Sequence, residues 1–170
     1  IQIENCHFAY GHGGVAMGSA ISGGIRNVTI RSCLMDNENW SPLRFKSQPS
    51  RGGTVENITF EDITIKGARS IFDINMEWRM VHPLSPAHYP LTCLRNIHFK
   101  NINGEAQSAG TMYGFKEAPF GNDTFFFENC HIKAQKGLSI SNVANVNFKG
   151  LELEIKEGEK IYERSANKDK

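Results

Sequence analysis

The sequence lacks several features that define common classes of protein. It contains no run of about 18 apolar residues, so no membrane-spanning helix is expected. Its formal net charge is only +1, whereas proteins that bind the phosphates of nucleic acids carry a clear excess of basic residues. The segment beginning at Ile1 has neither the basic region nor the cleavage pattern of a signal peptide. Membranes and nucleic acids are therefore not expected partners, and any anion must be recognised by a local cluster of cations.

Cysteine is scarce, and its spacing fits no metal or redox motif. The four cysteines contain no C-x-x-C pair, and no histidine has a partner at metal-ligand spacing. The sequence therefore predicts neither a metal nor a cofactor. Cys6, Cys33 and Cys130 occupy an apolar column of the repeat described below, so they are interpreted as core fillers. A disulfide between Cys6 and Cys33, on adjacent strands, is the alternative.

What the sequence does contain is an internal repeat. With 170 residues, of which 39% are hydrophobic, the chain is expected to form one domain. A unit of alternating apolar and polar residues recurs between positions 1 and 146 in five steps that average 29 residues, a period typical of solenoids. The six units are residues 1–6, 28–33, 58–63, 97–102, 125–130 and 146–151.

Equivalent positions of the units form columns that predict parallel β-strands. Two apolar columns are two residues apart, which places their side chains on one face of a strand. A neighbouring outward column alternates in sign at every unit: Glu4, Arg31, Glu61, Lys100, Glu128 and Lys149. Parallel strands about 4.8 Å apart bring these opposite charges together, whereas antiparallel strands do not. We therefore predict an all-β fold, a right-handed parallel β-helix of about six rungs, where a rung is one full winding of the chain.

Two polar columns mark the expected bends. They are mostly asparagine, which tolerates unusual turn conformations and can bond the next rung: Asn27, Asn57, Asn96, Thr124 and Asn145, then Asn5, Ser32, Asp62, Asn101 and Asn129. A second strand per rung is predicted over 15–19, 43–47, 71–76, 112–116 and 138–142. We expect the β-helix to cover 1–155, a proline-rich insertion at about 77–92 to leave it as a loop, and 156–170 to form a last rung and a charged tail.

Three residues are candidates for binding an anionic ligand. His12 lies between glycines, which leaves its ring accessible for hydrogen bonding or proton transfer. Strand alternation on the next rung turns Arg44 and Lys46 outward together, where a forked guanidinium and a point charge suit a carboxylate. A solvated strand face is the alternative interpretation, and Asp73 on the following rung is placed to neutralise Arg44. Trp78, in the insertion, is placed either to stack on a sugar or to pack the loop.

Four motifs occur in order along the chain. They are Gly11-His12-Gly13-Gly14-Val15-Ala16-Met17-Gly18-Ser19, Ser22-Gly23-Gly24-Ile25-Arg26-Asn27-Val28, Arg44-Phe45-Lys46, and Gly52-Gly53-Thr54-Val55-Glu56-Asn57-Ile58. The ordered set resembles the polygalacturonases, glycoside hydrolase family 28, most densely over residues 1 to about 66. The resemblance implies a right-handed β-helix that hydrolyses α-1,4 bonds between galacturonic acids in pectin with inversion.

The same resemblance assigns roles to individual residues. It implies that His12 is catalytic and that Arg44 and Lys46 bind the substrate, with Phe45 in place of the usual isoleucine. The implied partner is an acidic polysaccharide, pectin or polygalacturonate. An extracellular or periplasmic location is implied as well, because pectin lies outside the cell.

The acid and base of such a reaction are missing from the sequence. Inverting hydrolysis needs two carboxyl groups roughly 6.5 to 9.5 Å apart. By resemblance they come from an Asn-x-Asp motif and an Asp-Asp pair before Gly-His-Gly, and neither precedes it in this sequence, because all five aspartates follow His12. We therefore expect a C-terminal segment of a polygalacturonase-like enzyme that is inactive by itself, with an uncovered first rung open to self-association.

Two other functions stay open at the level of sequence. A pectate lyase also uses a parallel β-helix, but it needs calcium held by clustered carboxylates, and no such cluster is evident. A non-catalytic β-helix that binds polysaccharide or serves as a scaffold fits the missing acids.

Overall fold

Parallel strands make up almost all of the regular structure. The computed structural model describes residues 1–79, 85–86 and 89–164, with side chains for all of these except 37–39. Within these ranges there is no helix long and apolar enough to cross a membrane. The strands are β1 (Gln2–Glu4), β2 (His7–Gly11), β3 (Val15–Met17), β4 (Ile25–Asn39), β5 (Leu43–Lys46), β6 (Thr54–Asn75), β7 (Cys93–Tyr113), β8 (Phe125–Glu128), β9 (Cys130–Ser141) and β10 (Leu151–Glu163).

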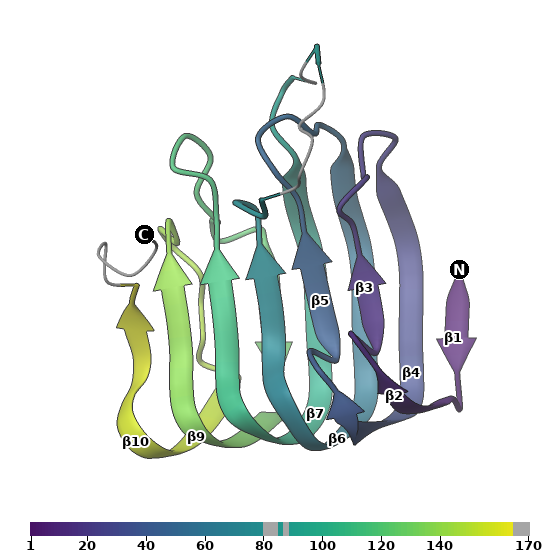
Figure 1. The fold of residues 1–170 in the computed structure, drawn as a ribbon, viewed down its shortest axis with the longest axis vertical. Helices are drawn as coiled ribbons and strands as arrows, with labels where there is room; N and C mark the ends of the chain where they lie inside the picture. Colours follow the sequence, from purple (N-terminus) through teal and green to yellow (C-terminus); the bar gives the residue numbers. More distant parts are fainter. Residues whose placement is uncertain (80–84, 87–88, 165–170) are drawn as a thin grey trace.

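The strands wind around one axis. Each pairs in parallel with a strand of the neighbouring rung, along the path β1-β4-β6-β7-β9-β10. In Figure 1 the front layer runs from β3 and β5 through the last parts of β6, β7 and β9 to β10, with β1 and β4 behind it. This winding is a parallel β-helix, as the sequence predicts.

Aromatic and branched side chains fill the inside of the winding. The predicted column Ile30, Phe60, Phe99 and Phe127 is in register from rung to rung. The Phe60 and Phe99 rings stack with their centroids 5.5 Å apart, and those of Phe99 and Phe127 with their centroids 5.3 Å apart. Because equivalent positions of successive repeat units lie above one another, their side chains form a continuous core.

The charged column on the outside has the predicted register. Glu4 lies opposite Arg31, and the pairing continues through Glu61 and Lys100 to Glu128. An Arg31 Nη2 to Glu4 Oε1 distance of 2.7 Å and a Lys100 Nζ to Glu128 Oε2 distance of 3.7 Å make ion pairs at both ends of this series. Such exposed pairs contribute little energy each, so they specify register more than stability.

Asparagine ladders hold the bends, as predicted. All five residues of the second polar column have positive φ, from 52° to 54°. Asn101 Nδ2 donates to Asp62 Oδ1 (2.8 Å), and Asn129 Nδ2 donates to Asn101 Oδ1 (2.8 Å). In the first polar column Asn27, Asn57 and Asn96 also have positive φ. Short polar side chains pay the smallest cost for this backbone conformation and bond the next rung at the same time.

The strand predicted within residues 146–151 is wrong for all but its last residue, because β10 begins only at Leu151. The Lys149 N–H donates to Asn147 Oδ1 (2.9 Å) and the Leu151 N–H to the Phe148 carbonyl (2.9 Å). These amides are satisfied locally and do not join the ladder to the preceding rung. The Phe148 ring still stacks on Phe127, with a centroid separation of 5.7 Å, so the core column continues without the strand.

The described part of the insertion after β6 lies outside the strands. Between the end of β6 and the start of β7 no described residue is in a strand. Residues 80–84 and 87–88 of that insertion, and 165–170 of the expected tail, lie outside the described residues. All four cysteines are free thiols, so Cys6 and Cys33 form no disulfide. Cys33 and Cys130 are buried, as predicted for core fillers, but the prediction is wrong for Cys6, which is exposed like Cys93.

Candidate active site

One outer face of the β-helix carries two of the three candidate side chains. Strand β3 pairs with β5, and β5 pairs with residues 72–75 of β6, which in turn pair with residues 110–113 of β7. Leu43 and Phe45 point into the core with 0% and 1% exposure. Alternation along β5 therefore directs Arg44 and Lys46 to the outside, as predicted.

Arg44 is outward-facing yet only 8% exposed. Its Nε lies 2.7 Å from Oδ2 of Asp73, the residue opposite it in β6. Its Nη1 donates to the main-chain carbonyl of His12 at 3.2 Å. The guanidinium thus bridges the rung before it and the rung after it, which fixes its orientation. The proposed neutralisation of Arg44 by Asp73 is therefore present.

Lys46 shares this environment and leaves the cluster with an excess of positive charge. Burial and the neighbouring charge of Arg44 lower the pKa of Lys46, while Asp73 acts in the opposite direction. Burial raises the pKa of Asp73, opposed by Arg44, Lys46 and a hydrogen bond with Thr111. Two cations face one carboxyl group, so the cluster keeps a local positive charge that suits an acidic ligand.

His12 reaches the cluster through its backbone. Its side chain is exposed, and in the described part of the chain the ring has no hydrogen bond or ion pair, so the contact with Arg44 is made by the carbonyl oxygen alone. The two glycines after His12 have a packing reason: a Cβ at Gly13 would lie 3.1 Å from the Ser41 carbonyl oxygen, and one at Gly14 would lie 2.6 Å from Met35 Sδ. The glycines therefore let the chain approach the next rung closely and hold the His12 carbonyl against Arg44.

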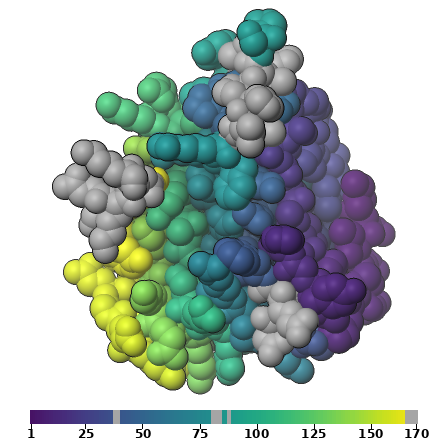
Figure 2. Space-filling model, viewed as in Figure 1, coloured from purple at the N-terminus to yellow at the C-terminus, as the bar shows by residue number. Residues whose placement is uncertain are grey.

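Trp78 completes the cluster. The sequence leaves two alternatives for its side chain, stacking on a sugar or packing the loop. The centre of its indole lies 4.9 Å from Arg44 Cζ and 5.0 Å from Lys46 Nζ. Part of its loop, in teal in Figure 2, projects at the top of the molecule in this view. The repeat could not place this side chain, because the insertion has no counterpart on the other rungs.

The other three histidines among the described residues lie in separate contacts. His7 pairs with Asp36 (2.6 Å), His131 pairs with Glu152 (3.0 Å), and His98 bonds Asn96 (2.7 Å) while stacking on Phe126. No group of three or more His, Cys, Asp or Glu side chains that could hold a metal ion occurs among residues 1–79, 85–86 and 89–164, side chains 37–39 apart.

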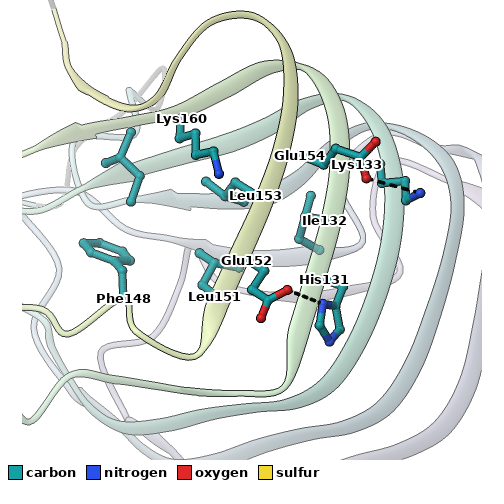
Figure 3. Close-up of a pocket in the computed structure, with 10 residues that line it drawn as sticks. His131, Ile132, Lys133, Phe148, Leu151, Glu152, Leu153, Glu154 and Lys160 are labelled. Atoms are coloured by element: carbon teal, nitrogen blue, oxygen red, sulfur yellow. Dashed lines mark ion pairs between the residues drawn. The ribbon is translucent and has the colours of Figure 1, made fainter.

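A separate cavity of about 590 Å³ lies at the C-terminal end of the winding (Figure 3). Its apolar lining is Ile132, Phe148, Leu151, Leu153 and Ile161, which belong to or pack on the core. Ion pairs between His131 and Glu152 and between Lys133 and Glu154 flank it. It is the end of the core column and is formed by β9, β10 and the segment before β10, so it takes no part in the cluster around Arg44.

Comparison with known proteins gives this cluster a context. Residues 1–152 match the model of the glycosyl hydrolases family 28. The chain belongs to this family. It is 38% identical over 113 residues to a polygalacturonase of Ralstonia solanacearum, covering 65% of this chain and 21% of the relative. It is 39% identical over 72 residues to a polygalacturonase of Ralstonia nicotianae, covering 39% of this chain and 13% of the relative. The chain thus spans about a fifth or less of the length of these curated relatives, and the resemblance to polygalacturonases expected from its motifs is confirmed.

Proposed function

We propose that this chain forms the carboxylate-binding part of a polygalacturonase-type active site. In this proposal Arg44 and Lys46 bind the carboxylate of a galacturonic acid unit in pectin, and His12 assists at the bond to be cleaved. Family membership and the polygalacturonase relatives support hydrolysis of a pectic polysaccharide over elimination by a lyase. Because pectin lies outside the cell, we also propose an extracellular or periplasmic location.

The observation that carries the proposal is the joint placement of Arg44, Lys46 and the His12 backbone. Arg44 holds the His12 carbonyl at 3.2 Å, so the Gly-His-Gly segment and the two cations are parts of one unit. Asp73 fixes the guanidinium without cancelling the charge of Lys46. A pre-oriented pair of cations binds a carboxylate without first having to order its own side chains.

Binding of galacturonate oligomers tests the proposal. We expect Lys46→Ala to weaken the binding of trigalacturonate by about ten- to a hundredfold, because a charge-assisted contact contributes about 1.5–3 kcal/mol. Arg44→Ala should have an effect at least as large, since it also leaves Asp73 without its partner. The measurement is isothermal titration calorimetry. Lys133→Ala is the matched control, because Lys133 is a strand lysine paired with Glu154 near the C-terminal cavity; equal losses in all three variants would contradict the proposal.

We further propose that the acid and base of the hydrolysis lie outside these 170 residues. No Asp-Asp pair occurs in the sequence, and its one Asn-x-Asp, Asn167-Lys168-Asp169, lies far after His12. Asp73, the carboxyl group beside Arg44, is engaged by that guanidinium. Inversion needs two carboxyl groups on opposite sides of the bond. We therefore expect the purified chain to release no reducing ends from polygalacturonate under conditions in which it binds trigalacturonate. Steady release of reducing ends, lost in His12→Ala, would show that the acid and base are within the chain.

A non-catalytic polysaccharide-binding β-helix is the second candidate, and it shares the binding step. The absence of the acid and base motifs before His12 favours it.

Self-association through the first rung also stays a proposal. In the structure Ile1 is 78% exposed and Ile3 is partly buried.

A further inference from the structure

The loop after β6 places an aromatic ring on both cations of the proposed site. The Trp78 indole centre is 4.9 Å from Arg44 Cζ and 5.0 Å from Lys46 Nζ. Cations are attracted to the electron-rich face of an indole, and the attraction grows where water is excluded. Trp78 and Lys46 are both partly buried, and Arg44 is 8% exposed.

Trp78 is anchored at the start and the end of its loop. The main-chain N–H of Trp78 donates to the carbonyl of Ser47, the residue after Lys46, at 2.8 Å. Ser47 Oγ lies 2.8 Å from Thr92 Oγ1, which also bonds the carbonyl of Gly52 at 3.0 Å. Ser47 and Thr92 are buried. The loop thus leaves and rejoins the β-helix next to Lys46, which fixes where the indole can lie.

The two cations differ in their partners. Arg44 has a carboxylate, Asp73, at 2.7 Å and the His12 carbonyl at 3.2 Å. Lys46 forms no ion pair within the described part of the chain, and its ammonium faces the indole instead. Burial and, after it, repulsion by the neighbouring Arg44 lower the pKa of Lys46. A flexible lysine beside a like charge would turn toward solvent unless another group held it.

We infer that Trp78 is the specificity-determining residue of this site, holding Lys46 in the position where it accepts a uronate carboxylate. The inference rests on the proposed function and deepens it, because it assigns the two cations different tasks. Arg44, held by Asp73, connects the rungs as well as binding the carboxylate, whereas Lys46 supplies the positive charge that Asp73 does not offset. Trp78 therefore selects sugars with a free carboxylate over their methyl esters, which present no charge to Lys46.

Calorimetry on two ligands tests this inference. We expect Trp78→Ala to weaken the binding of trigalacturonate about tenfold but to change the binding of its fully methyl-esterified form less than about twofold, since only the acid uses the charge of Lys46. Trp78→Phe should retain most of the affinity for the acid. The matched control is Trp40→Ala: Trp40 is 46% exposed and its ring lies 3.9 Å from Arg69 Cζ. This variant should bind both ligands like the parent.

A second measurement needs no ligand. In protein carrying ¹³C-labelled lysine, the Lys46 Cε–Hε signal, assigned by its absence in Lys46→Arg, should be displaced upfield by the indole ring current. It should return to the range of exposed lysines in Trp78→Ala and stay displaced in Trp40→Ala. Thermal unfolding monitored by circular dichroism verifies that each variant is folded.

The outcomes separate the inference from the proposed function. If the parent binds trigalacturonate and Trp78→Ala binds it equally well or more tightly, Trp78 has no selecting role and the inference alone fails. Equal losses for the acid and the ester mean that Trp78 only maintains the shape of the site, which also overturns it. If the parent binds neither ligand, the proposed function fails and the selecting role fails with it, while the lysine spectrum still decides whether Trp78 holds Lys46.

Discussion

Replacing Phe99 by alanine is expected to lower the free energy of unfolding by about 3–5 kcal/mol. Phe99 is completely buried, and its ring stacks between Phe60 and Phe127, with centroids 5.5 and 5.3 Å away. It also meets the edge of Phe72 at 5.1 Å. Truncation would leave a cavity that two rungs line at once, and strands held in register cannot close it.

Chemical denaturation followed by circular dichroism measures this loss. Phe126→Ala is the control, because Phe126 points outward, is 41% exposed and stacks only on His98 within the described residues. We expect this variant to lose about 1 kcal/mol or less. Similar losses for Phe99→Ala and Phe126→Ala would mean that the stacked rings do not carry the core.

Replacing Gly110 by alanine should have a still larger effect, more than about 4 kcal/mol or complete failure to fold. Gly110 has a φ of +125°, and a Cβ there would lie 2.0 Å from the Phe72 carbonyl oxygen. Phe72 is its partner in the neighbouring strand, so the collision is with main chain that is itself hydrogen-bonded. The strands must separate, and Thr111, which bonds Asp73 behind Arg44, would move with them.

Gly158→Ala gives the matched comparison. Gly158 also has a positive φ, +79°, but a Cβ there would meet nothing within 4 Å. This variant should lose only the backbone cost of about 1–2 kcal/mol. Melting temperatures of the two variants, with soluble yield as a second measure, separate the steric cost from the conformational one. If Gly110→Ala melts no lower than Gly158→Ala, the close approach of β6 and β7 tolerates a side chain.

The fold could be predicted because its main interactions are between repeat-equivalent positions. The column Ile30, Phe60, Phe99 and Phe127 and the alternation of charge from Glu4 to Glu128 are both visible in the sequence. Each fixes which residues lie side by side once the strands are parallel. Prediction failed between Val146 and Gly150, where Asn147 bonds the Lys149 amide and keeps the segment out of the ladder. A local competitor of this kind is not visible in a pattern of apolar residues.

The candidate site could be predicted only in part. Alternation along β5 gives the side to which Arg44 and Lys46 point, and register gives Asp73 as a neighbour. Neither rule says what covers a side chain, so the near-complete burial of Arg44 was not foreseeable. The position of Trp78 depends on the path of a loop that has no counterpart on other rungs, and periodicity carries no information about it.

The asparagine ladder reveals how such a protein can change its ligand. Asn57 bonds Asn27 across 30 positions of sequence, and Asn96 bonds Asn57 across 39, with the same side-chain atoms. The extra length is absorbed in the segment that carries Trp78, while the strands on either side keep their pairing. The loop that carries Trp78 can therefore be replaced without changing the paired strands. Loops of different length and chemistry could be grafted between Asn75 and Cys93, giving new sugar preferences on the same β-helix.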